Sequence, residues 1–231
     1  MTTVIAFGDS IVQGVVNPNG RPTISRTSFV KLCEKKLGIS VLNKARLGCT
    51  VERGEEIFDR FIDTVRSSDA RYVVFDFGGN DCDFDWKRVC DHPDEKIGPN
   101  VDRASFRAHY RSLVQKVRAE GKEPILLSLP PIVSEKFFKW ISRELCEETI
   151  LRFLGGDVGN LADWHMSYNL AVFNLALEQK VRIIDISSCF LQEKNYKDLF
   201  SIDGIHPNEE GHALIAETIC AYVRDENLHC S

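Results

Sequence analysis

The chain contains 231 residues, which is enough to bury a substantial hydrophobic core without metal or disulfide crosslinks. Hydrophobic residues make up 43% and charged residues 27%, which excludes a disordered chain, a coiled coil and a collagen-like polymer. The formal net charge is −5 and Lys and Arg form no basic stripe, so nucleic acid is not expected as a partner. No apolar run reaches the roughly 18 residues that cross a membrane. The first residues also lack the features of a signal peptide, so we expect a soluble, cytoplasmic protein with no membrane partner.

Short β-branched runs alternate with longer amphipathic stretches along the whole chain. Five apolar runs predict buried strands, at residues 3–7, 41–43, 72–77, 124–129 and 181–186. Amphipathic stretches predict helices at residues 28–37, 52–65, 106–118, 134–153, 163–179 and 210–224. Strands separated by helices indicate βαβ units. We therefore predict one α/β domain over residues 1–231, with a five-stranded parallel sheet that helices cover on both faces.

Residues 82–103 show little periodicity and contain several turn-forming residues. An irregular segment of about 20 residues is uncommon inside a compact domain and is often functional. This segment follows the carboxyl end of a strand, where open α/β sheets bind their ligands. We therefore predict that residues 82–103 form a long loop over the active site, with 17–25 and 155–164 as smaller loops beside it.

Eight cysteines raise the question of a disulfide framework: Cys33, Cys49, Cys82, Cys90, Cys146, Cys189, Cys220 and Cys230. They contain no Cys-x-x-Cys pair and no Cys/His spacing typical of a zinc site. In a chain without a leader, we expect most of them to be reduced and to serve as small apolar residues. Cys49 and Cys82 stand beside candidate site residues.

The acidic run Asp81-x-Asp83-x-Asp85 resembles the start of a calcium-binding loop. Trp86 stands where that loop needs glycine, however, and His92 stands where it needs its last glutamate ligand. We therefore predict neither calcium nor any other metal or cofactor, and expect Asp83 and Asp85 to shape access to the site.

Two motifs pair a serine with a histidine that is distant in the sequence. Gly8-Asp9-Ser10 ends the first strand; alone it favours a helix N-cap, but at the sheet edge a helix N-terminus also stabilises negative charge. A serine needs a base that a third group orients. Asp203-x-x-His206 offers both, since the carboxylate reaches one ring nitrogen and leaves the other for Ser10. Taken alone, the Asp203-x-x-His206 spacing is more typical of a polar loop in which Asp203 and Asn208 act as caps.

Two further positions offer hydrogen-bond donors. Gly78-Gly79-Asn80-Asp81 ends the most apolar strand, and its glycine pair allows both a sharp turn and the close approach of a reactant. The Asn80 amide is suited to stabilise an oxyanion, although the same tetrapeptide makes an ordinary turn. The amide of Gly48, after the second strand, is a second candidate donor and is unremarkable by itself.

Together, the motifs resemble those of the SGNH hydrolase family, also called GDSL-type lipases and acylhydrolases. They are, in order, Gly8-Asp9-Ser10-Ile11, Asn43 with Gly48, Gly78-Gly79-Asn80-Asp81 and Asp203-x-x-His206-Pro207. The resemblance extends from residue 3 to about residue 225, and Ile11 stands where the family usually has leucine. It implies a three-layer, flavodoxin-like α/β/α fold with Ser10 as nucleophile, His206 as base and Asp203 as the acid that orients the histidine. It also implies an oxyanion hole formed by the amides of Ser10 and Gly48 and the side chain of Asn80, with Asp9 and Asp81 bracing the loops.

The expected activity is hydrolysis of carboxylic esters through an acyl-enzyme. Trp86, Trp140 and Trp164 offer rings for stacking on a sugar, which favours a short-acyl ester of a carbohydrate or another small soluble substrate. A thioesterase or a lysophospholipase of the same family is the alternative, and a non-catalytic carbohydrate- or ligand-binding module on this scaffold is the alternative from another class. His109 and His165 are expected to be structural, with a place in the pocket wall as the alternative. The oligomeric state is left open.

Overall fold

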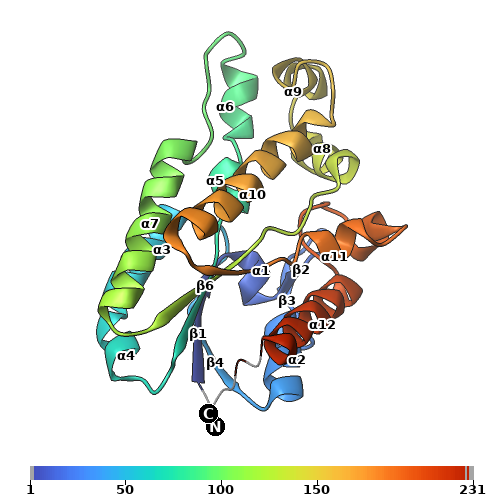
Figure 1. Ribbon diagram of the computed structural model, residues 1–231. Coiled ribbons are helices and arrows are strands. Elements are labelled where there is room, and N and C mark those ends of the chain that lie inside the picture. The colour runs from blue at the N-terminus through green and yellow to red at the C-terminus, as the bar shows by residue number, and fades with distance from the viewer. Residues whose placement is uncertain (1–2, 227, 229–231) are drawn as a thin grey trace.

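A five-stranded parallel sheet forms the centre of the protein (Figure 1). The computed structural model describes residues 3–226 and 228. The strands run across the sheet in the order β4 (Ser40–Asn43), β1 (Thr3–Gly8), β5 (Tyr72–Asp76), β6 (Glu123–Leu127) and β7 (Arg182–Ile184). Numbered in chain order, the five strands have the order 2-1-3-4-5, which is typical of flavodoxin-like folds. In these folds, ligands bind at the carboxyl edge of the sheet between the first and third strands, where the chain connections run to opposite sides. The predicted fold class is confirmed, and the divergence lies between β1 and β5.

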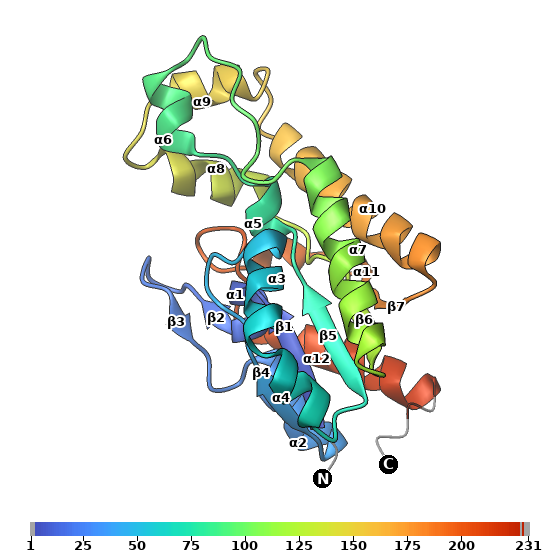
Figure 2. The same ribbon diagram turned by 90° about the vertical axis from the view of Figure 1, so that its left-hand side faces the viewer.

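Helices cover both faces of the sheet, as Figures 1 and 2 show. Ile5, Phe75 and Leu126 point toward one face and pack under α3 (Val51–Arg60), α7 (Arg103–Ala119) and α10 (Asn160–Gln179). Val4 and Ile125 point toward the other face, under α2 (Phe29–Leu37) and α12 (Glu209–Asp225). Because the central strands β1, β5 and β6 are buried on both sides, their sequences are almost continuously apolar rather than alternating.

Several predicted elements are divided or supplemented in the structure. The helix expected over 52–65 is two helices, α3 and α4 (Ile62–Ser67), and the one expected over 134–153 is α8 (Ser134–Ser142) and α9 (Glu147–Phe153). Residues 17–25 include part of a small hairpin, β2 (Val15–Val16) with β3 (Thr23–Ile24). The other unpredicted elements are α1 (Ser10–Gln13), α5 (Gly79–Cys82), α6 (Trp86–Asp91), α11 (Ser188–Leu191) and η1 (Tyr196–Leu199). All of these are too short to produce a readable period.

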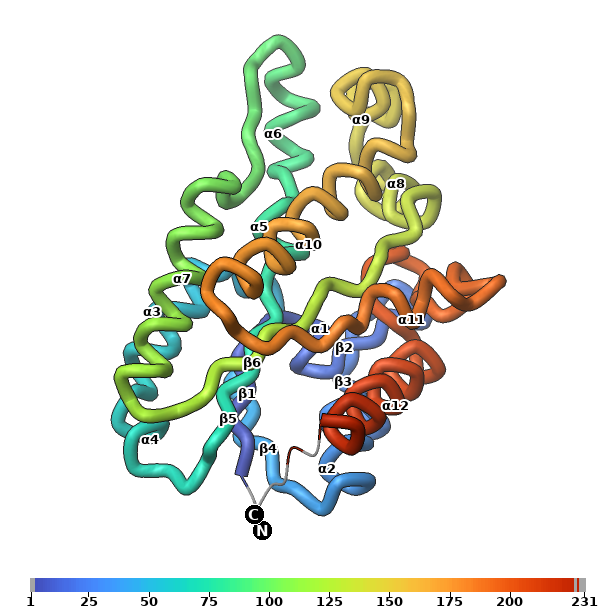
Figure 3. Tube along the Cα trace, in the orientation of Figure 1, coloured from blue at the N-terminus to red at the C-terminus, as the bar shows by residue number. Residues whose placement is uncertain are grey.

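The segment 82–103 is not a continuous loop, because it contains helix α6. Asp85 caps this helix by accepting a hydrogen bond from the Arg88 amide at 2.9 Å. In Figure 3 the chain rises from α5 through α6, turns at the top and returns to α7. Helices α6, α8 and α9 pack around an aromatic cluster, in which the ring of Phe84 lies 5.4 Å from that of Trp86 and 5.1 Å from that of Phe153.

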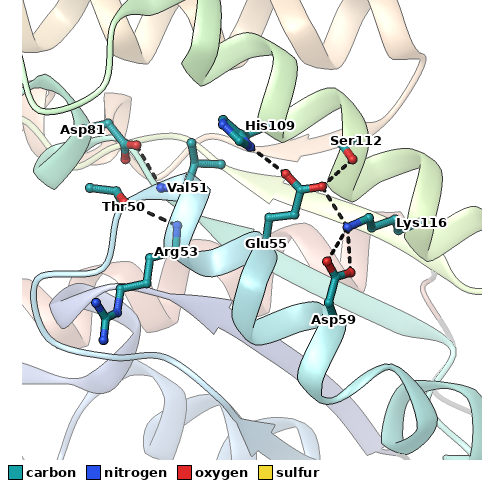
Figure 4. A network of polar contacts seen from close by, with 9 residues as sticks. All are labelled: Thr50, Val51, Arg53, Glu55, Asp59, Asp81, His109, Ser112 and Lys116. Atoms are coloured by element: carbon teal, nitrogen blue, oxygen red, sulfur yellow. Dashed lines mark hydrogen bonds and ion pairs between the residues drawn. The ribbon is translucent and has the colours of Figure 1, made fainter.

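A polar network joins α3 to α7 below this region (Figure 4). The Glu55 carboxylate contacts His109 Nδ1 at 2.6 Å, accepts from Ser112 Oγ at 2.5 Å and pairs with Lys116 Nζ at 2.8 Å. Burial opposes its ionisation, but hydrogen bonds from Lys116, Ser112 and His109 outweigh that effect and lower the pKa of Glu55 to about 2. His109 therefore has the structural role expected of it.

Replacing Glu55 by glutamine is expected to lower the free energy of unfolding at pH 7 by about 1–2 kcal/mol. A carboxylate whose pKa is depressed in the folded state stabilises that state above its unfolded pKa, and loses this effect as the pH falls. The difference between wild type and E55Q should therefore shrink from about pH 4.5 toward pH 2, as measured by urea unfolding across that range. The exposed acid Asp94 provides the control, and D94N should differ little from wild type at any pH.

Candidate active site

The first strand delivers Ser10 to the carboxyl edge of the sheet. Gly8 packs so closely that an added Cβ would lie 2.5 Å from Val12 Cγ2 and 2.9 Å from the Asp76 carbonyl oxygen. Asp9 caps α1 by accepting a hydrogen bond from the Ile11 amide at 2.8 Å. The N-cap interpretation of this motif therefore holds for Asp9, while Ser10 begins the helix and lies at the edge of a cavity.

The structure brings Ser10, His206 and Asp203 together in one line of hydrogen bonds. Ser10 Oγ lies 2.9 Å from His206 Nε2, although the two residues are 196 positions apart in the sequence. His206 Nδ1 lies 2.8 Å from Asp203 Oδ2. The other oxygen of Asp203 accepts the backbone amides of Ile205 at 3.1 Å and His206 at 3.0 Å. The imidazole is thus held with one nitrogen on the carboxylate and the other on the hydroxyl.

Asn17 completes the shell of Asp203 and was not predicted. The side-chain Nδ2 of Asn17 donates to Asp203 Oδ2 at 2.6 Å, and the backbone amide of Asn17 donates to Ser201 Oγ at 3.0 Å. Burial opposes ionisation of Asp203, but hydrogen bonds from His206 and Asn17 outweigh it and hold the pKa of Asp203 below its usual value. In the sequence Asn17 stands in a turn-rich stretch, Asn17-Pro18-Asn19-Gly20, and nothing in that stretch points to a partner 186 residues away.

Asn80 and the two neighbouring acids tie the loops after β1 and β5 together. Asn80 Nδ2 donates to Asp9 Oδ2 at 2.9 Å and lies 3.4 Å from the Cys49 carbonyl oxygen. Asp81 Oδ1 accepts the Val51 amide at 2.8 Å, at the N-terminus of α3 (Figure 4). Asp9 and Asp81 therefore brace the loops that carry Ser10 and Asn80.

Gly48 is a predicted oxyanion-hole residue that the structure does not bring into the cavity. It is exposed, has a φ of 70° and lies in the turn before α3. It is not among the residues that line the cavity, although the next residue, Cys49, contacts Asn80. A role for the Gly48 amide stays a prediction.

A cavity of about 80 Å³ opens beside Ser10 and His206. On the usual measure this volume accommodates about half a dozen water molecules. Segment 82–103 forms one wall through Cys82, Asp83, Phe84 and Trp86. The other walls come from the loop after β6, from α8 and from the start of α10: Leu129, Pro130, Ile132, Phe137, Leu161, Trp164 and His165.

Comparison with known proteins adds to this geometry. A model of the GDSL-like Lipase/Acylhydrolase family matches residues 6–214. The chain belongs to this family. It is 22% identical to the GDSL esterase/lipase CPRD49 of Arabidopsis thaliana, over 99% of this chain and 81% of that protein.

Solved structures share the fold of this GDSL hydrolase. The lipase/acylhydrolase of Enterococcus faecalis superposes with a TM-score of 0.70 at 18% identity, over 98% of this chain and 97% of that one. A variant of an acetyl-xylooligosaccharide esterase from Geobacillus Stearmophilus superposes with a TM-score of 0.65 at 21% identity, over 96% and 93% of the two chains. Family membership makes the chain a carboxylic ester hydrolase, which confirms the class predicted from the four motifs.

Three buried acids lie beneath the active site of the GDSL hydrolase. Burial raises the pKa of Asp9 to about 6 and that of Asp81 to about 7. Burial and the neighbouring Asp9 raise the pKa of Asp76, the last residue of β5, well above its usual value. Because all three shifts favour the neutral acid, the folded state loses stability as rising pH ionises them.

The acidic run after β5 makes its contacts within the protein. Asp83 Oδ1 accepts the Trp86 indole N–H at 2.8 Å, Asp85 caps α6, and Asp81 caps α3. Within residues 3–226 and 228, no three His, Cys, Asp or Glu side chains are grouped so as to hold a metal ion. The seven cysteines in the described residues are free thiols, and Cys230 lies outside those residues. No described helix combines the length and apolar composition needed to span a bilayer.

Proposed function

We propose that the protein hydrolyses short-acyl esters of carbohydrates or other small soluble molecules through an acyl-enzyme on Ser10. The observation that carries this proposal is the hydrogen-bonded line itself, with 2.9 Å from Ser10 Oγ to His206 Nε2 and 2.8 Å from His206 Nδ1 to Asp203. A serine hydroxyl becomes an effective nucleophile when an oriented base takes its proton, and these contacts supply both the base and its orientation.

The reaction follows from these contacts in two steps. Ser10 Oγ attacks the ester carbonyl while His206 Nε2 takes its proton, and the ionised Asp203 stabilises the imidazolium that forms. The tetrahedral oxyanion is stabilised by the Ser10 amide at the start of α1 and by the second side-chain N–H of Asn80, which turns to it from the Cys49 carbonyl 3.4 Å away. His206 then protonates the departing alcohol, and water releases the acid by the same route in reverse.

The small size of the cavity, about 80 Å³, supports a short acyl group. Two structural neighbours are described as acetyl-xylooligosaccharide and acetyl xylan esterases, which supports a carbohydrate ester. Two of the three tryptophans, Trp86 and Trp164, line the cavity, and Trp140 does not. Trp86 is buried against Phe84, the Trp164 indole is held by the Cys82 carbonyl at 2.7 Å, and the Trp140 ring is covered by Arg143 at 3.7 Å.

A fluorophosphonate probe tests the proposal directly. We expect rapid covalent labelling, which peptide mass spectrometry should assign to Ser10. Turnover of p-nitrophenyl esters should then fall as the acyl chain lengthens, with acetylated xylan, an acyl-CoA and a lysophospholipid compared in parallel. Absence of labelling in well-folded protein would instead support the ligand-binding module, and a preference for the acyl-CoA or the lysophospholipid would support the thioesterase or the lysophospholipase.

Replacing Asn80 by alanine should lower kcat by about 10²–10³ and change KM little, because the lost hydrogen bond forms mainly in the transition state. Steady-state kinetics with p-nitrophenyl acetate measures both constants. Asn195, in an exposed loop away from the cavity, is the matched control, and N195A should retain wild-type kinetics. A kcat for N80A within twofold of wild type would remove Asn80 from the oxyanion hole.

A further inference from the structure

His165 is the one buried histidine of the described chain whose ring has no hydrogen-bond partner there. It lies on α10 with 7% of its surface exposed, and it lines the cavity next to Ser10. The other buried histidines are held by the protein. His206 contacts Ser10 and Asp203, and His212 contacts the Val15 carbonyl at 3.3 Å and the Phe29 amide at 3.4 Å.

An unpartnered imidazole in this position requires a partner from the cavity. Leaving a buried donor or acceptor unsatisfied is unfavourable, and nearly all such groups in proteins bind protein or water. The side chains of Phe84, Leu129 and Leu161 line the same cavity and offer no polar atom. The partner of His165 is therefore an atom of whatever fills the cavity, either water or substrate.

A second buried polar group faces the same space. Asp76 is 1% exposed and lines the cavity, and its Oδ2 has no partner among the described residues. Burial lowers the pKa of His165 to about 4, while burial and Asp9 raise that of Asp76 well above its usual value. The His165 imidazole is therefore neutral at neutral pH, the shift of Asp76 favours its neutral acid form, and both groups offer hydrogen-bonding capacity to the cavity.

The remaining lining residues exclude an anion. No lysine or arginine lies among the residues that line the cavity, so a carboxylate or phosphate would lose its hydration without gaining an opposite charge. A neutral imidazole carries one donor and one acceptor, and a hydroxyl group complements both. The cavity therefore suits an uncharged group that bears a hydroxyl.

Building on the proposed function, we propose that His165 is a substrate-binding residue that hydrogen-bonds a hydroxyl group of the ester, and that anionic esters are rejected from the cavity. The hydroxyl belongs to the acyl group or to the alcohol, whichever occupies the cavity. This assignment adds a specificity residue to the Ser10, His206 and Asp203 line and explains why a polar side chain is present in an aromatic wall.

Two matched ester pairs test the assignment. In one, p-nitrophenyl 3-hydroxybutyrate is compared with p-nitrophenyl butyrate, and in the other 2-hydroxyethyl butyrate is compared with propyl butyrate. We expect the hydroxylated member of one pair to have a kcat/KM about five- to tenfold higher, the effect of one neutral hydrogen bond. In H165L that ratio should fall to about one, and in H165Q, whose amide also donates and accepts, part of it should return. Monopropyl succinate should be the poorest substrate.

The control is His109, which bonds Glu55 outside the cavity, so H109L should keep the wild-type ratio. Three results would each overturn the assignment. They are a kcat/KM ratio of one for both ester pairs in wild type, an unchanged ratio in H165L, and a preference for monopropyl succinate. Fluorophosphonate labelling of wild type at Ser10 separates the two proposals. If Ser10 is not labelled, the proposed function fails. If Ser10 is labelled but both kcat/KM ratios are one, only the role of His165 is refuted. If H165L does not fold, H165Q and the wild-type ratios still decide.

Discussion

Replacing Ser10 by alanine is expected to lower kcat for p-nitrophenyl acetate by at least about 10⁴ and to abolish fluorophosphonate labelling. The reason is that the hydroxyl oxygen is the only atom that the mechanism allows to form the acyl-enzyme. The one hydrogen bond that this hydroxyl makes within the described residues, to His206 Nε2 at 2.9 Å, is expected to add little to folding. The melting temperature of S10A should therefore stay close to that of wild type, as differential scanning calorimetry can check.

The matched control for S10A is S142A. The Ser142 hydroxyl donates to the Phe138 carbonyl at 2.8 Å within α8, and it does not line the cavity. S142A should keep both turnover and labelling. Persistent turnover by S10A, after contaminating esterases have been excluded, would contradict the assignment of the nucleophile.

Replacing Asp203 by asparagine should lower kcat by about 10⁴ while leaving the fold intact. The carboxylate oxygen that faces His206 Nδ1 accepts from it at 2.8 Å and from Asn17 at 2.6 Å. An amide nitrogen at that place would repel both donors, and an amide oxygen there would lack the charge that stabilises the imidazolium. We therefore expect His206 in D203N to carry its proton on Nε2, the nitrogen that faces Ser10. That nitrogen can then no longer accept the proton of the serine.

Labelling kinetics distinguish D203N from S10A. D203N retains the Ser10 hydroxyl, so the fluorophosphonate should still react there, only much more slowly, whereas S10A should not react at all. Asp198 lies in the exposed η1 segment of the same region and is the control, and D198N should behave as wild type. Near-normal kcat in D203N would show that His206 is oriented by other contacts.

The strands and the gathering of the main site residues could be predicted because each rests on a local signal. Residues 3–7 and 72–77 are continuous apolar runs, and the structure places β1 and β5 within one residue of those bounds. Parallel strands present their carboxyl ends at one edge of the sheet. The sequence therefore predicts that the motifs following these strands, which contain Ser10 and Asn80, lie near each other.

Other features depend on contacts that no local pattern encodes. Asn17 reaches Asp203 across 186 residues, and its own surroundings read only as a turn. Helix α6 has six residues, too few for a period to appear, so the sequence predicts a loop over 82–103. His165 stands on a long buried helix where packing is the default expectation, and only the arrangement of α10 beside segment 82–103 reveals the cavity that it lines.

The 196-residue separation between Ser10 and His206 has a consequence for biosynthesis. A ribosome produces Ser10, the proposed nucleophile, just after the first strand, but His206, the proposed base, emerges only after all five strands of the sheet have been translated. A nascent or prematurely terminated polypeptide therefore carries a serine without its proton acceptor and is hydrolytically silent. Appearance of esterase turnover during cell-free translation should consequently report completion of the polypeptide rather than formation of its early β-structure.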